Sequence, residues 1–198
     1  MSNEWDEYAE NWDVDPTVEK YARKAFSELV DNLNIDGLTV LDFGCGTGVL
    51  TQFMSPAVKS IVAIDPSSEM IKYLDNKALD NVSSIADYLS EELVQNRPEL
   101  ANKFDLIVAS SVCGFLPDYE ATLSLLKSLI KEGGVFVQWD WLSIDDSSDT
   151  GLSEKRVKQA FIVNDFVNTK ITCPFIMSSS KGDMPVLMAM GTNTLQTV

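Results

Sequence analysis

Three glycines at alternate positions follow an acidic residue in the segment VLDFGCGTGVLT (residues 40–51). Asp42 comes first, and Gly44, Gly46 and Gly48 follow at every second position. Glycines lack a Cβ atom, so this backbone can turn tightly and let a ligand approach closely. Its N–H groups, with the N-terminus of the helix expected after them, favour a negatively charged group. A plain turn needs one or two glycines, so three in alternation indicate a ligand site.

The glycine loop is predicted to join a strand to a helix, because segments typical of strands and helices alternate along the chain. The strand-like segments are short apolar runs, as expected when both faces of a sheet are covered. Ligands of open α/β sheets bind outside the carboxyl ends of the strands. Each acid alone could be a helix cap, but together the polar strand ends predict a binding crevice; they are Asp42, Asp65, Asp87, Ser110–Ser111 and Asp140.

The alternation predicts an α/β fold: a single doubly wound, Rossmann-like domain with a seven-stranded, mostly parallel sheet and helices on both faces. The end of the chain differs, because the segments PFIMSSS and PVLMAMGT around Lys181–Asp183 predict a C-terminal antiparallel hairpin. Asp15 and Pro16 predict the start of a helix with one apolar face before the sheet. The helix after the fourth strand is expected to end at Gly133–Gly134.

Composition limits the chemistry and the partners. The chain has 198 residues, a net charge of −15 and no histidine, which removes the usual general base and the commonest metal ligand, so no metal is expected. The charge opposes binding to nucleic acid and anionic membranes, and no apolar run reaches the roughly 20 residues of a membrane span. The acidic start is not typical of a secretory signal. Cys45, Cys113 and Cys173 are isolated, which favours a cytoplasmic location.

The glycine loop resembles the D-x-G-x-G-x-G loop of the class I S-adenosylmethionine-dependent methyltransferases. A dinucleotide loop, G-x-G-x-x-G, would place its third glycine at Val49 instead of Gly48. The opening WDEYAENWD is similar to the aromatic segment that many small-molecule members fold over the cofactor. Further segments are similar to the family's other motifs, in order: VAIDPSSEMI, IADYL and FDLIVASSVCGFLPDYEATLSLLKSLIKEGGVFV.

The resemblance implies S-adenosylmethionine as cofactor and S-adenosylhomocysteine as product. It implies that Asp65 holds the ribose hydroxyls, Met70 packs on the adenine and Asp87 meets the adenine amino group. The domain would then comprise an N-terminal lid segment and helix (1–36), a cofactor-binding core (37–141) and a C-terminal helix and hairpin (142–198). The residues expected at the cofactor are Trp12, Asp42, Gly44, Cys45, Gly46, Gly48, Asp65, Pro66, Met70, Ala86, Asp87 and Ser110.

Methyl transfer from a sulfonium depends mainly on alignment, so the lack of histidine is tolerable. For an acceptor that must lose a proton, Asp140 and Tyr8 are the candidate bases, and burial would raise the pKa of Asp140. For Asp140 the sequence favours a role as base and a purely structural role, as a hydrogen-bonded residue near the crevice rim, about equally. An apolar wall without lysine or arginine predicts a small organic acceptor; its expected residues are Trp12, Cys113, Phe115, Trp139 and Trp141, beside Asp140.

Two other functions stay open on the sequence alone. One is an NAD(P)-type oxidoreductase on a related fold, which Val49 and the antiparallel tail disfavour. The other is a non-catalytic protein that keeps the fold and the cofactor as an interaction module. Residues 1–15 hold Trp5, Tyr8 and Trp12 among acids and are expected to form a loose lid, with a docked structural segment as the alternative. The sequence fixes neither the acceptor, the methylated atom nor the oligomeric state.

Overall fold

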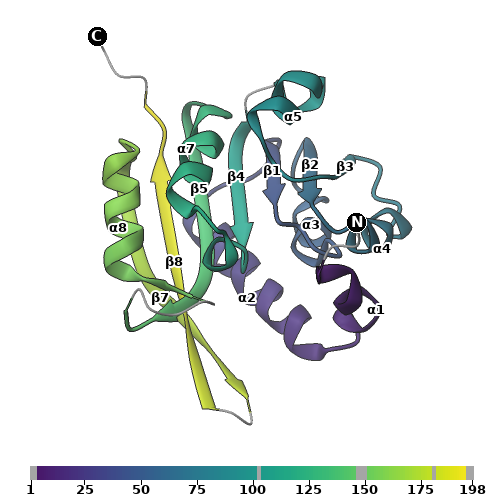
Figure 1. The fold of residues 1–198 in the computed structure, drawn as a ribbon, viewed down its shortest axis with the longest axis horizontal. Helices are drawn as coiled ribbons and strands as arrows, with labels where there is room; N and C mark the ends of the chain where they lie inside the picture. Colours follow the sequence, from purple (N-terminus) through teal and green to yellow (C-terminus); the bar gives the residue numbers. More distant parts are fainter. Residues whose placement is uncertain (1–3, 102–103, 146–150, 180–181, 195–198) are drawn as a thin grey trace. The chain divides into compact units, whose positions relative to one another are not determined.

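The structure is a computed structural model that describes residues 4–101, 104–145, 151–179 and 182–194. The chain divides into two compact units, Met1–Asn102 and Lys103–Val198, each described here by itself (Figure 1). The predicted α/β class is confirmed, because parallel strands alternate with helices and an antiparallel hairpin ends the chain.

The first unit contains three parallel strands in the order β3-β2-β1, with helices in their connections. The register pairs Asp42 of β1 with Ala63 of β2, and Asp65 of β2 with Ala86 of β3, so the strands end at one edge. The elements are η1 (Glu4–Tyr8), α1 (Ala9–Trp12), α2 (Pro16–Asn32), β1 (Thr39–Phe43), α3 (Val49–Met54), β2 (Ser60–Asp65), α4 (Ser68–Asn76), β3 (Val82–Ala86), α5 (Glu91–Asn96) and α6 (Pro98–Ala101).

The second unit contains strands in the order β4-β5-β8-β7, and a short strand, β6, pairs with β5. β4 and β5 are parallel, whereas β8 is antiparallel to both β5 and β7. The β7–β8 hairpin extends beyond the end of β5 in Figure 1. The elements are β4 (Phe104–Ser110), η2 (Cys113–Phe115), α7 (Tyr119–Ser128), β5 (Ile130–Ser143), β6 (Leu152–Ser153), α8 (Glu154–Val163), β7 (Val167–Ser179) and β8 (Gly182–Thr192).

The helix predicted at Asp15 and Pro16 is confirmed as α2. The Asp15 carboxylate accepts a hydrogen bond from the N–H of Thr17 at 2.8 Å, and Pro16 is the first helical residue. This arrangement satisfies one of the free N–H groups at the start of a helix. The side chains that α2 buries recur at helical spacing, as the sequence predicts; they are Tyr21, Ala22, Ala25 and Leu29.

The prediction that Gly133–Gly134 closes the preceding helix is wrong. α7 ends at Ser128, and both glycines lie inside β5, where its register against β4 shifts. Gly133 has a φ of 76°, and a Cβ on Gly134 would lie 2.6 Å from the Ile130 side chain. The glycines therefore permit an irregularity within the strand, a role that the sequence pattern does not separate from helix termination.

Strand β5 continues past Asp140 to Ser143, so Asp140 is not the end of the strand. The parallel pairing with β4 does end there: its last pair is Ser110 with Trp139, and Asp140 is the next residue. Beyond that point β5 is held by β8 and β6. The two-residue β6 raises the predicted seven strands to eight in the described part of the chain, and Lys181 of the expected hairpin turn lies outside the described residues.

Helices α7 and α8 cover the same face of β5. Side chains alternate between the faces of a strand, so Phe136, Gln138 and Asp140 share one face. Phe136 packs against Phe161 of α8, with ring centroids 5.9 Å apart, and Gln138 bonds to Tyr119 of α7. The polar part of this face is therefore enclosed within the second unit.

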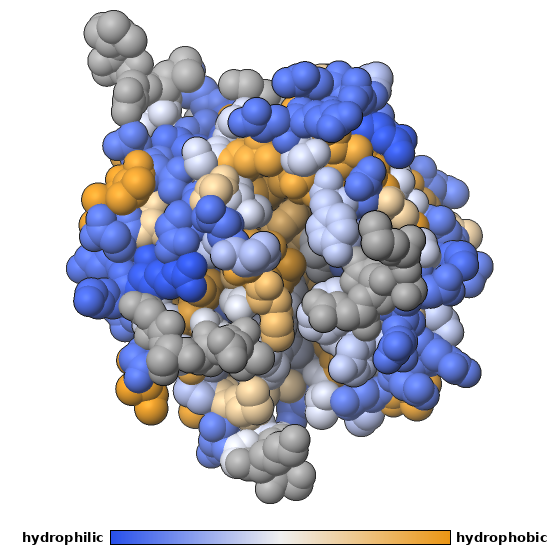
Figure 2. All heavy atoms as spheres, viewed as in Figure 1, coloured by the Kyte–Doolittle hydropathy of each residue, from blue (hydrophilic) through white to orange (hydrophobic). Residues whose placement is uncertain are grey.

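Hydrophilic residues cover much of the face seen in Figure 2, with hydrophobic residues exposed between them. Within the described ranges, none of the helices combines the length and the apolar character that crossing a membrane requires.

Candidate functional site

The glycine loop after β1 adopts a backbone conformation that requires glycine. Gly44, Gly46 and Gly48 have φ values of 70°, 54° and 78°, all in the left-handed region. Residues with a Cβ pay roughly 1–2 kcal/mol to adopt this conformation. A Cβ on Gly48 would also lie 2.3 Å from the Leu74 side chain of α4, whereas one on Gly46 would first meet Trp12, at 3.8 Å. The loop therefore packs tightly against α4 and faces Trp12 at Gly46.

Four backbone N–H groups of this loop donate hydrogen bonds to acceptors within the first unit. Those of Gly44 and Cys45 donate to the Ile64 carbonyl, that of Gly46 to the Asp65 carboxylate, and that of Gly48 to the Cys45 carbonyl. The sequence predicts a negatively charged group at these N–H groups. In the structure three of them instead bind the loop to the end of β2, and the fourth bonds within the loop. A loop that cradles a phosphate needs such groups for the ligand.

Asp65 connects the loop to the start of α4. Its carboxylate accepts hydrogen bonds from the N–H of Gly46 and of Ser67, each at 2.9 Å, one on each oxygen. Burial raises the pKa of Asp65, and the nearby Asp6 raises it further, while the two N–H bonds lower it. An ionised carboxylate has about four acceptor positions, so each oxygen retains one for a ligand hydroxyl.

Asp42 lies beneath the glycine loop and is 1% exposed. Its carboxylate accepts a hydrogen bond from the Thr51 hydroxyl. Burial raises the pKa of Asp42 to about 7, and Asp65 adds to the rise. Burial also raises the pKa of the neighbouring Cys45 thiol. Asp42 is therefore an enclosed acid that binds the first turn of α3, directly after the glycine loop.

Residues 4–13, which we call the N-terminal strap, are docked on the same cluster. Asp6 accepts hydrogen bonds from the Ser67 hydroxyl at 2.6 Å and from the N–H of Glu69 at 3.4 Å. These groups lie at the start of α4, where a helix favours negative charge. The expected lid segment is thus folded and placed beside Asp65, and its residues 1–3 lie outside the described residues.

The other end of the strap is held by Asp13. Its carboxylate accepts a hydrogen bond from the Thr47 hydroxyl of the glycine loop and forms an ion pair with Lys77 at 2.9 Å. The Lys77 side chain is 17% exposed, so this pair is shielded more than a typical surface pair. Within the strap, Trp12 packs edge-on against Trp5, while Tyr8 is 57% exposed.

The remaining residues expected at the cofactor differ in accessibility. Met70 is 2% exposed within α4, and Pro66 is half-buried. Ala86 and Asp87 are exposed at the end of β3, and the N–H of Asp87 donates to the Asp65 carbonyl at 3.1 Å. The first unit therefore brings the expected residues of the glycine loop, β2 and β3 to one edge, whereas Ser110 belongs to the second unit.

The second unit contains its own buried polar cluster, centred on Asp140. Asp140 is 1% exposed and accepts hydrogen bonds from the N–H of Gly114 and from the Gln138 amide, both at 2.9 Å. The N–H of Cys113 donates to the same carboxylate. Burial raises the pKa of Asp140 to about 7, although these bonds oppose the rise. The carboxylate thus binds the loop that follows β4.

The residues expected to line the acceptor site differ in exposure. Trp139 and Cys113 are 0% and 1% exposed, whereas Phe115 is 38% exposed and Trp141 is partly accessible. Burial, together with Asp140, raises the pKa of the Cys113 thiol well above its ordinary value. Cys113 is therefore a packed thiol, unsuited to act as a nucleophile.

Sequence reasoning missed Gln138 and Tyr119, which complete the Asp140 cluster. Gln138 is fully buried, and its amide oxygen accepts a hydrogen bond from the Tyr119 hydroxyl at 2.7 Å. The sequence offered one sign of this cluster, a glutamine inside the apolar strand VFVQWDW. A buried amide needs hydrogen-bond partners, so this residue predicts further polar side chains nearby.

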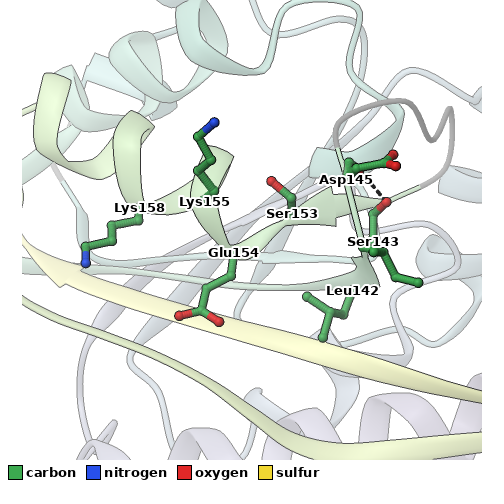
Figure 3. A pocket seen from close by; sticks show the side chains of 8 residues that line it. Leu142, Ser143, Asp145, Ser153, Glu154, Lys155 and Lys158 are labelled. Atoms are coloured by element: carbon green, nitrogen blue, oxygen red, sulfur yellow. Dashed lines mark hydrogen bonds between the residues drawn. The ribbon is translucent and has the colours of Figure 1, made fainter.

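A shallow pocket lies beyond Asp140, at the end of β5 and the start of α8 (Figure 3). Its volume is about 660 Å³, and it is lined by Leu142, Ser143, Ile144, Asp145, Ser153, Glu154, Lys155 and Lys158. In Figure 3 Lys155, Lys158 and Glu154 extend in different directions, so their charges do not converge on one point. The Ser143 hydroxyl donates a hydrogen bond to the Asp145 carbonyl.

Among the residues that the structure describes, no group of three or more histidine, cysteine, aspartate or glutamate side chains is arranged to hold a metal ion.

Comparison with known proteins shows the family to which the chain belongs. Residues 17–170 match the model of the methyltransferase domain family, Methyltransf_23. The chain therefore belongs to this family, and the family resemblance of its sequence motifs is confirmed.

Two curated relatives and one solved structure illustrate the similarity. The ubiquinone biosynthesis O-methyltransferase of Actinobacillus pleuropneumoniae serotype 5b (strain L20) is 35% identical over 103 residues, covering 50% of this chain and 44% of that protein. The malonyl-[acyl-carrier protein] O-methyltransferase of Acetivibrio thermocellus is 32% identical over 133 residues, covering 64% and 44%. This chain thus spans under half the length of either relative. The structure of a DhpI–SAH complex is 20% identical, covers 97% of this chain and 94% of that one, and has a TM-score of 0.73.

Burial of Asp42 predicts a specific pH dependence of stability. Its pKa is about 7 in the folded protein and about 3.9 in an unfolded chain. Between these values the folded state binds a proton that the unfolded state lacks, so Asp42 lowers the free energy of unfolding as pH rises through this range. The total effect is at most about 4 kcal/mol. In Asp42→Asn, whose amide oxygen can still accept from Thr51, the free energy of unfolding measured in urea should fall less than in the wild type between roughly pH 4 and pH 7.

Asp80→Asn is the matched control, because Asp80 is an exposed acid of the same unit. Its unfolding curves should follow those of the wild type across this range. If Asp42→Asn also follows the wild type, the pKa of Asp42 is not raised in the folded protein.

The Asp13 contacts predict how firmly the strap is held. Asp13→Ala removes the acceptor of Thr47 and the partner of Lys77. Backbone amides of residues 5–12 should then exchange hydrogen at least about tenfold faster in the ligand-free protein, since a charged hydrogen bond contributes about 1.5–3 kcal/mol. Glu10→Ala removes the same charge from an exposed position of the strap and should leave exchange nearly unchanged. Equal exchange in the two variants would show that the strap is held by other contacts.

Proposed function

We propose that this protein is an S-adenosylmethionine-dependent methyltransferase that acts on a small organic acceptor, mainly by aligning the two reactants. The observation that carries this proposal is the glycine loop, whose N–H groups bond within the protein while the Asp65 carboxylate beside it keeps free acceptor positions.

The loop fits an adenosyl ligand better than a dinucleotide. A dinucleotide site offers loop N–H groups to a pyrophosphate, whereas here four of them donate to Ile64, Asp65 and Cys45. A ribose presents two neighbouring hydroxyl donors, and the open positions on Asp65 would accept them. Trp12 of the strap lies over Gly46, 3.8 Å from where a Cβ would stand, so the strap borders the part of the loop where the resemblance places the cofactor. These features favour methyl transfer over the oxidoreductase alternative.

The acceptor is proposed to need little help from a base. When bound, S-adenosylmethionine supplies an electrophilic methyl group, so a nucleophilic atom held in line is sufficient. Asp140 is 1% exposed and already accepts from Gly114, Cys113 and Gln138, which favours a positioning role over its use as a base. Tyr8 is accessible in the strap and stays the candidate for an acceptor that must lose a proton.

An oxygen atom is the proposed site of methylation. The two curated relatives described above are both named O-methyltransferases. An oxygen that is already anionic at neutral pH, as in a carboxylate or an acidic phenol, requires no base. We therefore propose small aromatic or aliphatic acids and acidic phenols as the first acceptors to test.

The test has two stages. Calorimetry with S-adenosylmethionine, S-adenosylhomocysteine, NAD and NADP should show binding of the first two only. Release of S-adenosylhomocysteine is then measured with acidic phenols, benzoic acids, aliphatic acids and primary amines, and turnover is expected with an oxygen acceptor. Binding of NAD or NADP alone would support the oxidoreductase instead, and cofactor binding without turnover across the panel would support the non-catalytic alternative.

Loss of the Asp65 carboxylate should weaken cofactor binding. A hydrogen bond to a charged group contributes about 1.5–3 kcal/mol, so Asp65→Ala should raise the Kd for S-adenosylmethionine at least about tenfold. Asp36→Ala, which removes an exposed acid of the same unit, is the control and should bind like the wild type. Unchanged affinity in a folded Asp65→Ala protein would remove Asp65 from the proposed site.

A further inference from the structure

A buried chain of hydrogen bonds crosses the second unit from α7 to the loop after β4. The Tyr119 hydroxyl donates to the Gln138 amide oxygen at 2.7 Å, and the Gln138 amide nitrogen donates to Asp140 at 2.9 Å. Asp140 in turn accepts from the N–H of Gly114 at 2.9 Å. All three side chains are at most 1% exposed. Polar groups enclosed in this way are costly unless each finds a partner.

The direction of this chain is set at its Asp140 end. An ionised Asp140 carboxylate can only accept, so the Gln138 amide turns its nitrogen toward Asp140 and leaves its oxygen for the Tyr119 hydroxyl, which can donate or accept. The opposite orientation would bring the amide oxygen against the carboxylate, where two acceptors repel. On its outer side Tyr119 lies under the Arg156 guanidinium, 5.6 Å from the ring centre, and Arg156 forms two hydrogen bonds with Glu120.

The loop at the other end is tightly constrained. Ser111 adopts a left-handed φ of 57°, and its N–H donates to the Trp139 carbonyl at 2.7 Å. A Cβ on Gly114 would lie 3.1 Å from the backbone of Gly151. A non-glycine residue in the left-handed region costs of order 1–3 kcal/mol and persists only where its surroundings impose it. The bonds from β5, including those to Asp140, supply that constraint.

We propose that Tyr119 and Gln138 are positioning residues of methyl transfer, because they orient the Asp140 carboxylate that anchors residues 111–115. This inference rests on the proposed function, in which Cys113 and Phe115 belong to the acceptor side. Neither residue touches a reactant in this proposal. Both act through Asp140, whose carboxylate accepts hydrogen bonds from the N–H groups of Gly114 and Cys113 and so keeps the loop in one conformation.

Tyr119→Phe tests the anchoring directly, because it removes one hydroxyl and leaves the ring in place. The thiol of Cys113 reports on the loop, since it is 1% exposed when the loop is anchored. Alkylation by iodoacetamide, followed at the Cys113 peptide by mass spectrometry, should become roughly fivefold faster, which corresponds to the loss of about 1 kcal/mol. The control is Ser128→Ala, which removes an exposed hydroxyl of α7 bonded to the Leu125 carbonyl and should label like the wild type.

The catalytic effect is measured with the acceptor found for the wild type. Tyr119→Phe should lower kcat several-fold, while the Kd for S-adenosylhomocysteine stays within twofold. If the residues act as one chain, adding Tyr119→Phe to Gln138→Leu should lower kcat no further than Gln138→Leu alone, whereas independent structural effects would add. Asp140→Asn should also make Cys113 labelling faster, because it replaces the carboxylate that anchors the loop.

Two results would overturn the inference: Cys113 labelling in Tyr119→Phe equal to that in Ser128→Ala, or additive losses of kcat in the double variant. A wild-type protein that binds S-adenosylhomocysteine and methylates no acceptor would contradict the proposed function and the catalytic part of the inference. In that case, the rate of Cys113 labelling in Tyr119→Phe, compared with that in Ser128→Ala, would still decide whether Tyr119 anchors the loop.

Discussion

The two hydrogen bonds that Asp65 accepts hold together the segments of the first unit on which a ligand site would depend. One comes from Gly46 in the loop after β1 and the other from Ser67 at the start of α4, each at 2.9 Å. A carboxylate that is 8% exposed is costly without such partners, so the positions of the loop and the helix are tied to each other. Ser67 extends the connection, because its hydroxyl donates to Asp6 of the strap.

The second unit repeats this device with Asp140. In each unit an acid near the carboxyl end of one strand accepts from the backbone of the loop that leaves the neighbouring parallel strand: Asp65 from Gly46, and Asp140 from Gly114. Parallel neighbours end at the same edge, so an acid on one strand lies within reach of the loop that follows the other. Two of the polar residues near strand ends, Asp65 and Asp140, therefore fix loops, and a ligand would meet loops whose shape is already determined.

The alternation of strands and helices, the start of α2 and the C-terminal hairpin were predictable from the sequence, because each rests on local patterns of apolar residues, proline and acid. The role of Gly133–Gly134 was not, since glycine permits both a helix end and an irregular strand. The sequence predicts that the fifth strand ends near Asp140, and β5 ends three residues later, at Ser143, because β8 and β6 pair with it beyond β4. Local sequence carries no sign of such partners. The roles of Gln138 and Tyr119 depend on contacts 19 residues apart, which no periodicity reveals.

The acids of the first unit also bear on which ligand the site would accept. Asp42 and Asp65 accept hydrogen bonds from the neutral groups of Thr51, Gly46 and Ser67, and these dipoles do not cancel a charge as a lysine or arginine would. Asp65 raises the pKa of Asp42, and Asp6 raises that of Asp65, so the three acids lie close enough to repel. A pyrophosphate would add two further negative charges beside them, whereas a sulfonium is attracted. The electrostatics of the loop thus agree with its hydrogen bonding, and both favour the methyl donor over a dinucleotide.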